Sequence, residues 1–156
     1  IGAPGSDLTT ARYVPPPPHE MATALGDLEL FLHATDPMPT LLRVALAHAQ
    51  FETIHPFLDG NGRVGRLLIT FLLCTYGALR APLLYLSSYL EANRPDYYER
   101  LQAVRDEGDW ESWVRFFLRG VAEIQGVAGH EGHLIGVLDL IGIVTQDEWI
   151  VDERVI

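Results

Sequence analysis

The sequence contains no lysine, and all 11 of its basic Lys or Arg residues are arginine. A Walker-type phosphate-binding loop, a Schiff-base enzyme and a protein kinase each need a lysine at a defined position. The sequence therefore excludes these three classes. Any phosphate that the protein binds must be held by arginine side chains and main-chain N–H groups.

Cysteine and long apolar runs are also scarce. The one cysteine, Cys74, can form neither an internal disulfide nor a cysteine-rich zinc cluster, and its apolar neighbours predict an inert thiol in the core. No apolar stretch reaches the roughly 18 residues of a membrane span, and the first residues show no signal-peptide pattern. We therefore expect a cytoplasmic protein with no membrane partner.

Positive charge is outweighed by negative charge. The chain has 21 Asp and Glu residues against its 11 arginines, which gives a formal net charge of −10. Such a balance repels nucleic acid, so we expect no nucleic-acid partner. A length of 156 residues suffices for one domain with its own core.

Apolar residues recur at helical spacing from Pro18 to about residue 126. The pattern and its Pro and Gly punctuation predict helices between Pro18 and Pro37, from about Thr40 as an N-cap to residue 54, and from residue 61 to about 76. Further helices are predicted near residues 85–90, 97–105 and 110–124. The third helix is apolar nearly all round, so we expect it to be the buried centre of the bundle.

The two ends of the chain differ from this helical part. Residues 1–18 favour loop or extended structure, with a short strand at residues 11–14. Residues 126–156 combine several glycines with strand-favouring runs, and we predict no definite structure for this tail. The fold class is therefore all-α with a short β element in front of a helical core at about residues 20–125.

Residues 55–66, which read HPFLDGNGRVGR, form the densest cluster of reactive side chains. Gly60, Asn61 and Gly62 tolerate a positive φ, so the main chain here can turn several N–H groups toward one bound anion. A predicted helix begins at the same place, and its N-terminus adds about half a positive charge. Arg63 and Arg66 follow in the first helical turn, where the helix dipole disfavours cations unless an anion lies between them. The pattern predicts a polyphosphate site.

Two residues before this turn suggest a reaction. A carboxylate such as Asp59 is tolerated beside phosphates when Mg²⁺ bridges the two, and a neutral His55 can take a proton from an attacking hydroxyl. The alternative is an ordinary Asp-Gly or Asn-Gly turn whose arginines pair with surface acids. The fixed order of base, carboxylate, glycine turn and two arginines favours the phosphate site.

This segment matches the Fic-domain motif, His-Pro-Phe-x-Asp/Glu-Gly-Asn-Gly-Arg-x-x-Arg, at every specified position. The resemblance extends to residues 13–18 (YVPPPP), residues 47–54 (AHAQFETI) and residues 108–113 (GDWESW), so that about residues 1–125 resemble a Fic domain. It implies a Fic-type helical bundle with a β-hairpin flap at about residues 1–18. Residues 126–156 depart from the polar helix expected of the family.

Fic proteins typically transfer AMP from ATP to a hydroxyl side chain of a target protein and release pyrophosphate. The resemblance implies these roles for the matching positions: His55 as general base, Asp59 as Mg²⁺ ligand, Gly60, Asn61 and Gly62 as anion hole, Arg63 as phosphate ligand, Arg66 as partner of the γ-phosphate, and Asn93 and Tyr97 as part of the nucleotide pocket. It also implies that Phe57 anchors the loop in the core. Packing of Tyr97 in the core and capping by Asn93 are equally good explanations of these two residues.

The resemblance further implies two protein partners. A target segment would dock on the flap by strand addition, which fixes its hydroxyl through main-chain hydrogen bonds. Many family members are inhibited by a glutamate-bearing helix that pairs with the second motif arginine, and no such motif matches in this chain. Because the sequence begins with Ile1, we expect a fragment whose inhibitory helix lies in a missing N-terminal region.

Other functions stay open. The same scaffold could carry another nucleotidyl transfer or phosphocholine transfer, or serve as a catalytically silent nucleotide-binding or peptide-binding module. A subgroup that transfers the γ-phosphate has lysine where this chain has Gly62, which favours AMP transfer. His130 and His133 have a metal-like spacing without nearby acids, and His48 is more typical of a hydrogen-bonded core or surface histidine than of a ligand.

Overall fold

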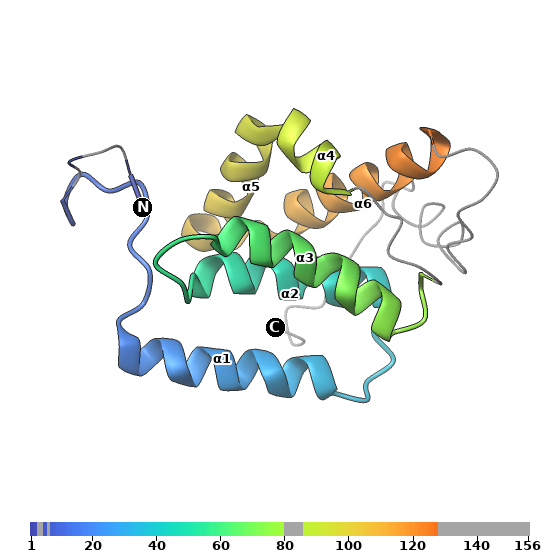
Figure 1. Cartoon of the computed structure of the whole chain (residues 1–156), viewed down its shortest axis with the longest axis horizontal. Coiled ribbons are helices and arrows are strands. Elements are labelled where there is room, and N and C mark those ends of the chain that lie inside the picture. The colour runs from blue at the N-terminus through green and yellow to red at the C-terminus, as the bar shows by residue number, and fades with distance from the viewer. Residues whose placement is uncertain (3–4, 6, 80–85, 128–156) are drawn as a thin grey trace.

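The computed structural model of the chain describes residues 1–2, 5, 7–79 and 86–127 (Figure 1). The helices are α1 (Pro18–His33), α2 (Thr40–Ile54), α3 (Asn61–Thr75), α4 (Leu86–Ala92), α5 (Arg94–Glu107) and α6 (Trp110–Val127). The all-α prediction is therefore confirmed. The predicted tail at residues 126–156, with His130 and His133, lies almost entirely outside the described residues, and the predicted domain boundary at residue 125 stays a prediction.

The expected β-hairpin flap is not formed in the described part of residues 1–17, which contains no strand. These residues instead make an irregular segment whose ends are held together. The main-chain N–H of Tyr13 donates to the carbonyl of Ile1 at 3.1 Å, and the amino group of Ile1 donates to the carbonyl of Tyr13. This exchange is a single antiparallel pair, shorter than the ladder that defines a hairpin.

Helix boundaries follow the punctuation of the sequence. Pro18 is the first residue of α1, where its missing N–H costs nothing because that group has no intrahelical acceptor. Thr40 begins α2 within the helix rather than as its cap, since Pro39 occupies the cap position and no side chain caps the helix. Gly77 and Gly108 follow α3 and α5 with positive φ values of 72° and 70°, as expected of helix-terminating glycines.

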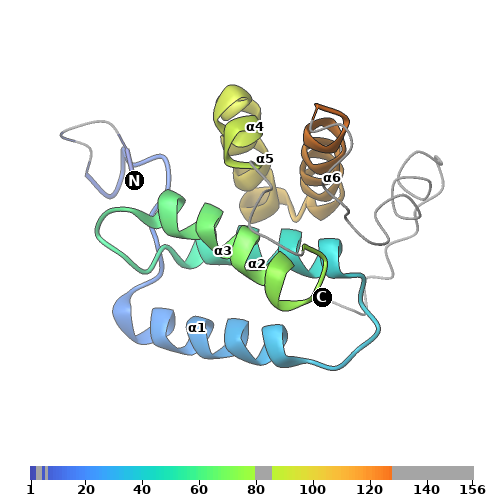
Figure 2. The same cartoon turned by 45° about the vertical axis from the view of Figure 1, so that its right-hand side comes forward.

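Helix α2 is the centre of the molecule. It packs against α1, α3, α5 and α6, and 10 of its 15 residues are buried. Figures 1 and 2 show α1 on one side of the α2 and α3 pair and α4 to α6 on the other. Three fully buried alanines, Ala45, Ala47 and Ala49, allow neighbouring helices to approach α2 closely.

The prediction that the third helix forms the buried centre was wrong. Leu67 and Phe71 of α3 are 68% and 62% exposed. The apolar pattern alone gives no position in the bundle, and α3 has α2 as its principal packing partner, so its opposite side stays open. Cys74 is half-buried against the edge of the core, a less enclosed position than predicted.

Two side chains connect α1 to the rest of the bundle at its C-terminal end. Arg43 of α2 donates to the main-chain carbonyl of Phe31 at 2.7 Å and stacks over its ring, with 5.4 Å between the guanidinium carbon and the ring centroid. The hydroxyl of Tyr76 donates to the carbonyl of Leu32 at 2.8 Å. These bonds satisfy carbonyls that a helix end leaves without intrahelical donors.

On the opposite side, Trp113 joins α6 to α2. Its side chain is fully buried, its indole N–H donates to the carbonyl of Ala45 at 2.9 Å, and its ring stacks on His48. Among the described residues, no helix combines the length and the apolar character needed to cross a membrane.

Candidate active site

His55 lies directly after α2 in a left-handed conformation, with φ 50° and ψ 56°. It is the only described residue other than glycine with a positive φ, a backbone conformation that disfavours side chains. Its ring nitrogen Nδ1 is buried without a well-formed hydrogen bond. Burial lowers the pKa of His55; an interaction with the main chain of Glu52 acts against this shift, and the positive charge of Arg105 acts with it. The imidazole is therefore held neutral at pH 7, as a general base requires.

The loop between α2 and α3 is closed by Asn61. Its side-chain Oδ1 accepts from the main-chain N–H of Phe57 at 2.8 Å, and its Nδ2 donates to the carbonyl of the same residue. Asn61 is buried and its side chain is bound to the loop, so only its main-chain N–H is left to bind an anion. The expectation that Phe57 anchors the loop in the core was wrong, because its side chain is 49% exposed and its ring lies against Phe51.

Each of the two motif arginines lies close to a glycine of the turn that opens α3. Gly60 has φ 87°, and the guanidinium of Arg63 lies 3.5 Å from the point where a Gly60 Cβ would be. The guanidinium of Arg66 lies 3.2 Å from the corresponding point at Gly62. The first N–H groups of α3 have no intrahelical acceptors, so donors and positive charge gather here.

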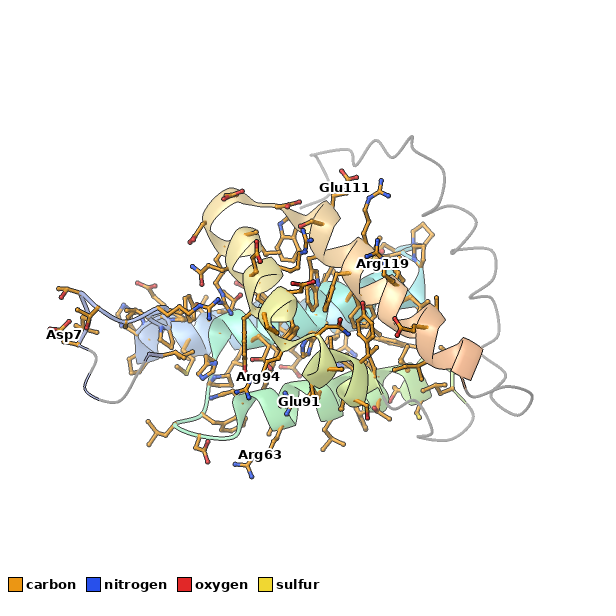
Figure 3. The ribbon with its side chains drawn as sticks, turned by 90° about the horizontal axis from the view of Figure 1, so that it is seen from above. Asp7, Arg63, Glu91, Arg94, Glu111 and Arg119 are labelled. Carbon is orange, nitrogen blue, oxygen red and sulfur yellow. The ribbon has the colours of Figure 1, made fainter. Side chains whose placement is uncertain are left out.

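Arg63 is held by Asp59 in this structure. The two exposed side chains form an ion pair of 3.0 Å, four residues apart, and Figure 3 shows Arg63 projecting away from the body of the molecule. This is the arrangement expected of a turn whose arginine pairs with a surface acid. An anion bound at the turn would compete with Asp59 for Arg63.

Asp59 is also the expected Mg²⁺ ligand. Within the described part of the chain, no cluster of three or more His, Cys, Asp or Glu side chains could hold a metal ion by itself. Mg²⁺ often uses only one or two carboxylates, with substrate phosphates and water completing its shell. The exposed carboxylate of Asp59 beside the α3 N-terminus fits that limited role.

A cavity of about 410 Å³ opens beside His55. His55, Gly62 and Tyr97 contribute to its lining, together with Tyr13 and Arg105 from opposite ends of the domain. Asn93 is not among its lining residues. Its side-chain amide donates to the carbonyl of Tyr89 at 2.9 Å, which ties it to the end of α4.

Arg66 opens onto a different hollow. Its side chain lines this second depression of about 460 Å³ with Ser87, Ser88 and Glu91 of α4. Of the expected site residues, His55, Gly62 and Tyr97 thus line the first hollow and Arg66 lines the second, while the others line neither. A ligand that contacts both Gly62 and Arg66 would extend from the first hollow toward the second.

His48 joins the site to the core. Its Nδ1 lies 3.0 Å from the carbonyl of Gly65, and its Nε2 lies 2.9 Å from the hydroxyl of Tyr97. Because a carbonyl can only accept, Nδ1 carries the proton and Tyr97 donates to Nε2. Burial lowers the pKa of His48 to about 4. The expectation of a hydrogen-bonded histidine is confirmed, and its surroundings are those of the core.

Three residues beside His55, namely Glu52, Arg105 and Tyr13, lie outside the 55–66 motif, so the motif did not predict them as part of the site. Glu52 is buried with Oε1 unpaired, and burial raises its pKa. Arg105 donates to the main-chain carbonyl of Glu52, and Tyr13 donates to that of Thr53. Glu52 lies in a segment that resembles the family, and an acid inside an apolar run is a detectable signal. Nothing local indicates Arg105, which is one of several arginines on amphipathic helices.

Comparisons with known proteins point to one family. Residues 3–73 match the model of the Fic/DOC family. The chain is 33% identical over 84 residues to a probable protein adenylyltransferase of Aquifex aeolicus, which covers 54% of this chain and 26% of that protein. It is 36% identical over 106 residues to a protein adenylyltransferase Fic of Culex quinquefasciatus, which covers 67% of this chain and 20% of that protein. The chain therefore spans about a fifth to a quarter of the length of these relatives.

Proposed function

The chain contains a Fic domain, and from this premise we propose that the protein transfers AMP from ATP to a hydroxyl side chain of a target protein. The observation that carries the proposal is the shared position of His55 and Gly62 on one cavity. A neutral base and the donor-rich N-terminus of α3 thus face the same space. Phosphoryl-type transfer depends mainly on such positioning and charge stabilisation.

In the proposed reaction, the target hydroxyl oxygen attacks the α-phosphorus of ATP. The bond between the α-phosphorus and the bridging oxygen to the β-phosphate breaks, and pyrophosphate leaves. His55 takes the hydroxyl proton, for which its lowered pKa keeps it available at pH 7. The N–H groups of Gly60, Asn61 and Gly62 and the guanidinium of Arg63 would hold the phosphates, and Arg66 would reach the γ-phosphate.

Two further parts of the proposal concern bound partners. Asp59 would hold Mg²⁺ together with the phosphates, and the ion would supply positive charge against the polyphosphate. The target segment would dock by strand addition on residues 1–17, whose extended end at Tyr13 lies next to the cavity. Tyr97 would line the nucleotide pocket. Asn93, whose amide is bound to α4, would shape that pocket through the start of α5.

Inhibition by a glutamate-bearing helix that pairs with Arg66 is part of the same proposal. It is supported by the family resemblance and by the second hollow, where Arg66 makes no ion pair with the described residues. The competing functions on the Fic scaffold, namely other nucleotidyl transfer and phosphocholine transfer, differ only in the group attached to phosphate. The chemical group that becomes attached to the target protein distinguishes these functions from AMP transfer.

The test is transfer of radiolabel from ATP to protein in a lysate with Mg²⁺. We expect more label from [α-³²P]ATP on protein with the wild type than with the lysate alone, and no such increase with His55→Ala. Neither protein should increase label from [γ-³²P]ATP above that of the lysate alone, whose own kinases transfer the γ-phosphate. An increase in label from the γ-position alone would contradict AMP transfer. Equal α-label with His55→Ala would contradict the role of His55, and the Tyr76→Phe variant provides a folded control outside the site.

A further inference from the structure

The C-terminal end of α2 leaves two carbonyls that its own helix cannot satisfy. The carbonyl of Glu52 would normally accept from residue 56, but Pro56 has no N–H. The carbonyl of Thr53 would accept from Phe57, whose N–H is already bound to the side chain of Asn61. The next residue after the helix is His55 in its strained left-handed conformation.

Side chains from two distant segments satisfy these carbonyls. Arg105 of α5 donates through Nη2 to the carbonyl of Glu52 and through Nε to the hydroxyl of Thr53, both at 3.2 Å. The hydroxyl of Tyr13 donates to the carbonyl of Thr53. The guanidinium carbon of Arg105 lies 4.0 Å from the centroid of the Tyr13 ring, so the two side chains also stack on each other.

We propose that Tyr13 and Arg105 form a clamp that positions His55 for catalysis. The clamp fixes the main chain of residues 52 and 53, which sets the direction in which the chain turns into His55. It also connects three parts of the molecule: the segment before α1, the end of α2 and the face of α5. This inference rests on the proposed function, in which the segment containing Tyr13 receives the target.

The chain offers a matched control for each clamp residue. Tyr76 donates its hydroxyl to a helix-end carbonyl, as Tyr13 does, and Arg43 donates to a helix-end carbonyl while stacking on an aromatic ring, as Arg105 does. Both act at the end of α1, far from His55 in the fold. Variants of Tyr76 and Arg43 therefore show the effect of losing a hydrogen bond at a helix end in general. Variants of Tyr13 and Arg105 show the effect of losing such a bond beside His55.

The first measurement is steady-state AMP transfer by the wild type and the variants Tyr13→Phe, Arg105→Gln, Tyr76→Phe and Arg43→Gln. We expect kcat to fall about 10-fold in Tyr13→Phe and about 100-fold in Arg105→Gln, because small displacements of a reacting group have effects of this size. The controls should keep the wild-type kcat. The double variant Tyr13→Phe/Arg105→Gln should resemble Arg105→Gln, since members of one unit are not additive.

The second measurement needs no activity. Amide hydrogen exchange of residues 48–57 should quicken in the two clamp variants relative to the controls, compared at equal free energy of unfolding. A rise in KM for ATP with unchanged kcat would overturn the clamp, because Tyr13 and Arg105 would then contact the nucleotide instead. Unchanged kcat and exchange would overturn it as well. If the wild type transfers no α-label, the proposed function fails, while the exchange result still decides whether the clamp exists.

Discussion

Gly65 shows how a single residue allows α2 and α3 to approach each other. A Cβ at this position would lie 2.3 Å from Oε1 of Glu52 and 3.2 Å from both His48 and Phe51. The glycine also leaves its carbonyl next to Nδ1 of His48. One missing side chain thus permits the contact between the central helix and α3, whose first turn is the proposed phosphate site.

Gly65→Ala should therefore destabilise the protein by about 1–3 kcal/mol despite the better helix propensity of alanine, because the added methyl group overpacks the contact. Gly26→Ala is the matched control, since Gly26 lies within α1 with no atom within 4 Å of its Cβ position. That variant should gain up to about 1 kcal/mol. Urea unfolding of both proteins measures the difference, and a stabilised Gly65→Ala variant would show that the contact is looser than described.

The environment of His55 makes a prediction about pH. Burial lowers its pKa, and Arg105 assists, so the base should stay unprotonated as the pH falls through the ordinary value of about 6.5. The acid limb of kcat/KM for AMP transfer should accordingly lie below pH 6.5. A limb at or above pH 6.5 would contradict the assignment of this imidazole as the base.

At the scale of elements, α3 combines two unlike surfaces. One side packs on α2 through Ile69, Leu72 and Leu73, and the other leaves Leu67 and Phe71 open. Its N-terminal turn carries the positive end of the helix dipole and Arg63, and Arg66 follows in the second turn. The helix thus lies at the side of the bundle. Its N-terminal end, and not its middle, contributes residues to the candidate site.

This position gives a test by substitution. Leu67→Gln and Phe71→Gln should each change the free energy of unfolding by no more than about 0.5 kcal/mol, as for other surface positions. Leu73→Ala, on the buried side of the same helix, should cost about 2–5 kcal/mol. Thermal and denaturant unfolding measure the free energy of unfolding of the three variants. An equal loss of stability in all three would contradict the lateral position of α3.

At the scale of the whole molecule, His48 connects four helices. It belongs to α2, accepts from Tyr97 of α5 and donates to Gly65 of α3, while its ring stacks on Trp113 of α6. The network is fully buried, so a charge placed on this ring has no solvent to stabilise it. The packing of the bundle therefore depends on the neutral form of one imidazole.

The stability of the protein should reflect this. The pKa of His48 is about 4 in the folded protein and about 6.5 in the unfolded chain, so the unfolded state binds more protons between these values. Stability that is present above pH 6.5 should be lost as the pH falls toward 4, by roughly 3 kcal/mol from this residue. Urea unfolding from pH 7 to 4 measures the loss, and His48→Gln should show a shallower decline. Parallel curves would mean that His48 titrates alike in both states.

Much of the local structure could be predicted from the sequence. The first helix begins at Pro18 and the third ends just before Gly77, as the Pro and Gly punctuation predicted, and the residue order from His55 to Arg66 indicated the candidate site. Such signals act over a few residues, through backbone geometry and helical period, so they do not depend on the rest of the fold. The β-hairpin flap that the resemblance implied is not formed in the described part of residues 1–17, because strand pairing depends on more than the composition of these residues.

The sequence by itself thus determined the helical class and the order of side chains in residues 55–66: a histidine, a carboxylate, a glycine turn and two arginines. Only the tertiary structure decided that α2 is central, that Arg63 and Arg66 face different surroundings, and that Tyr13 and Arg105 meet beside His55. The hydrogen bonds from these two residues to Thr53 span 40 and 52 positions. Contacts of that range depend on how whole helices pack, and no local pattern of side chains encodes them.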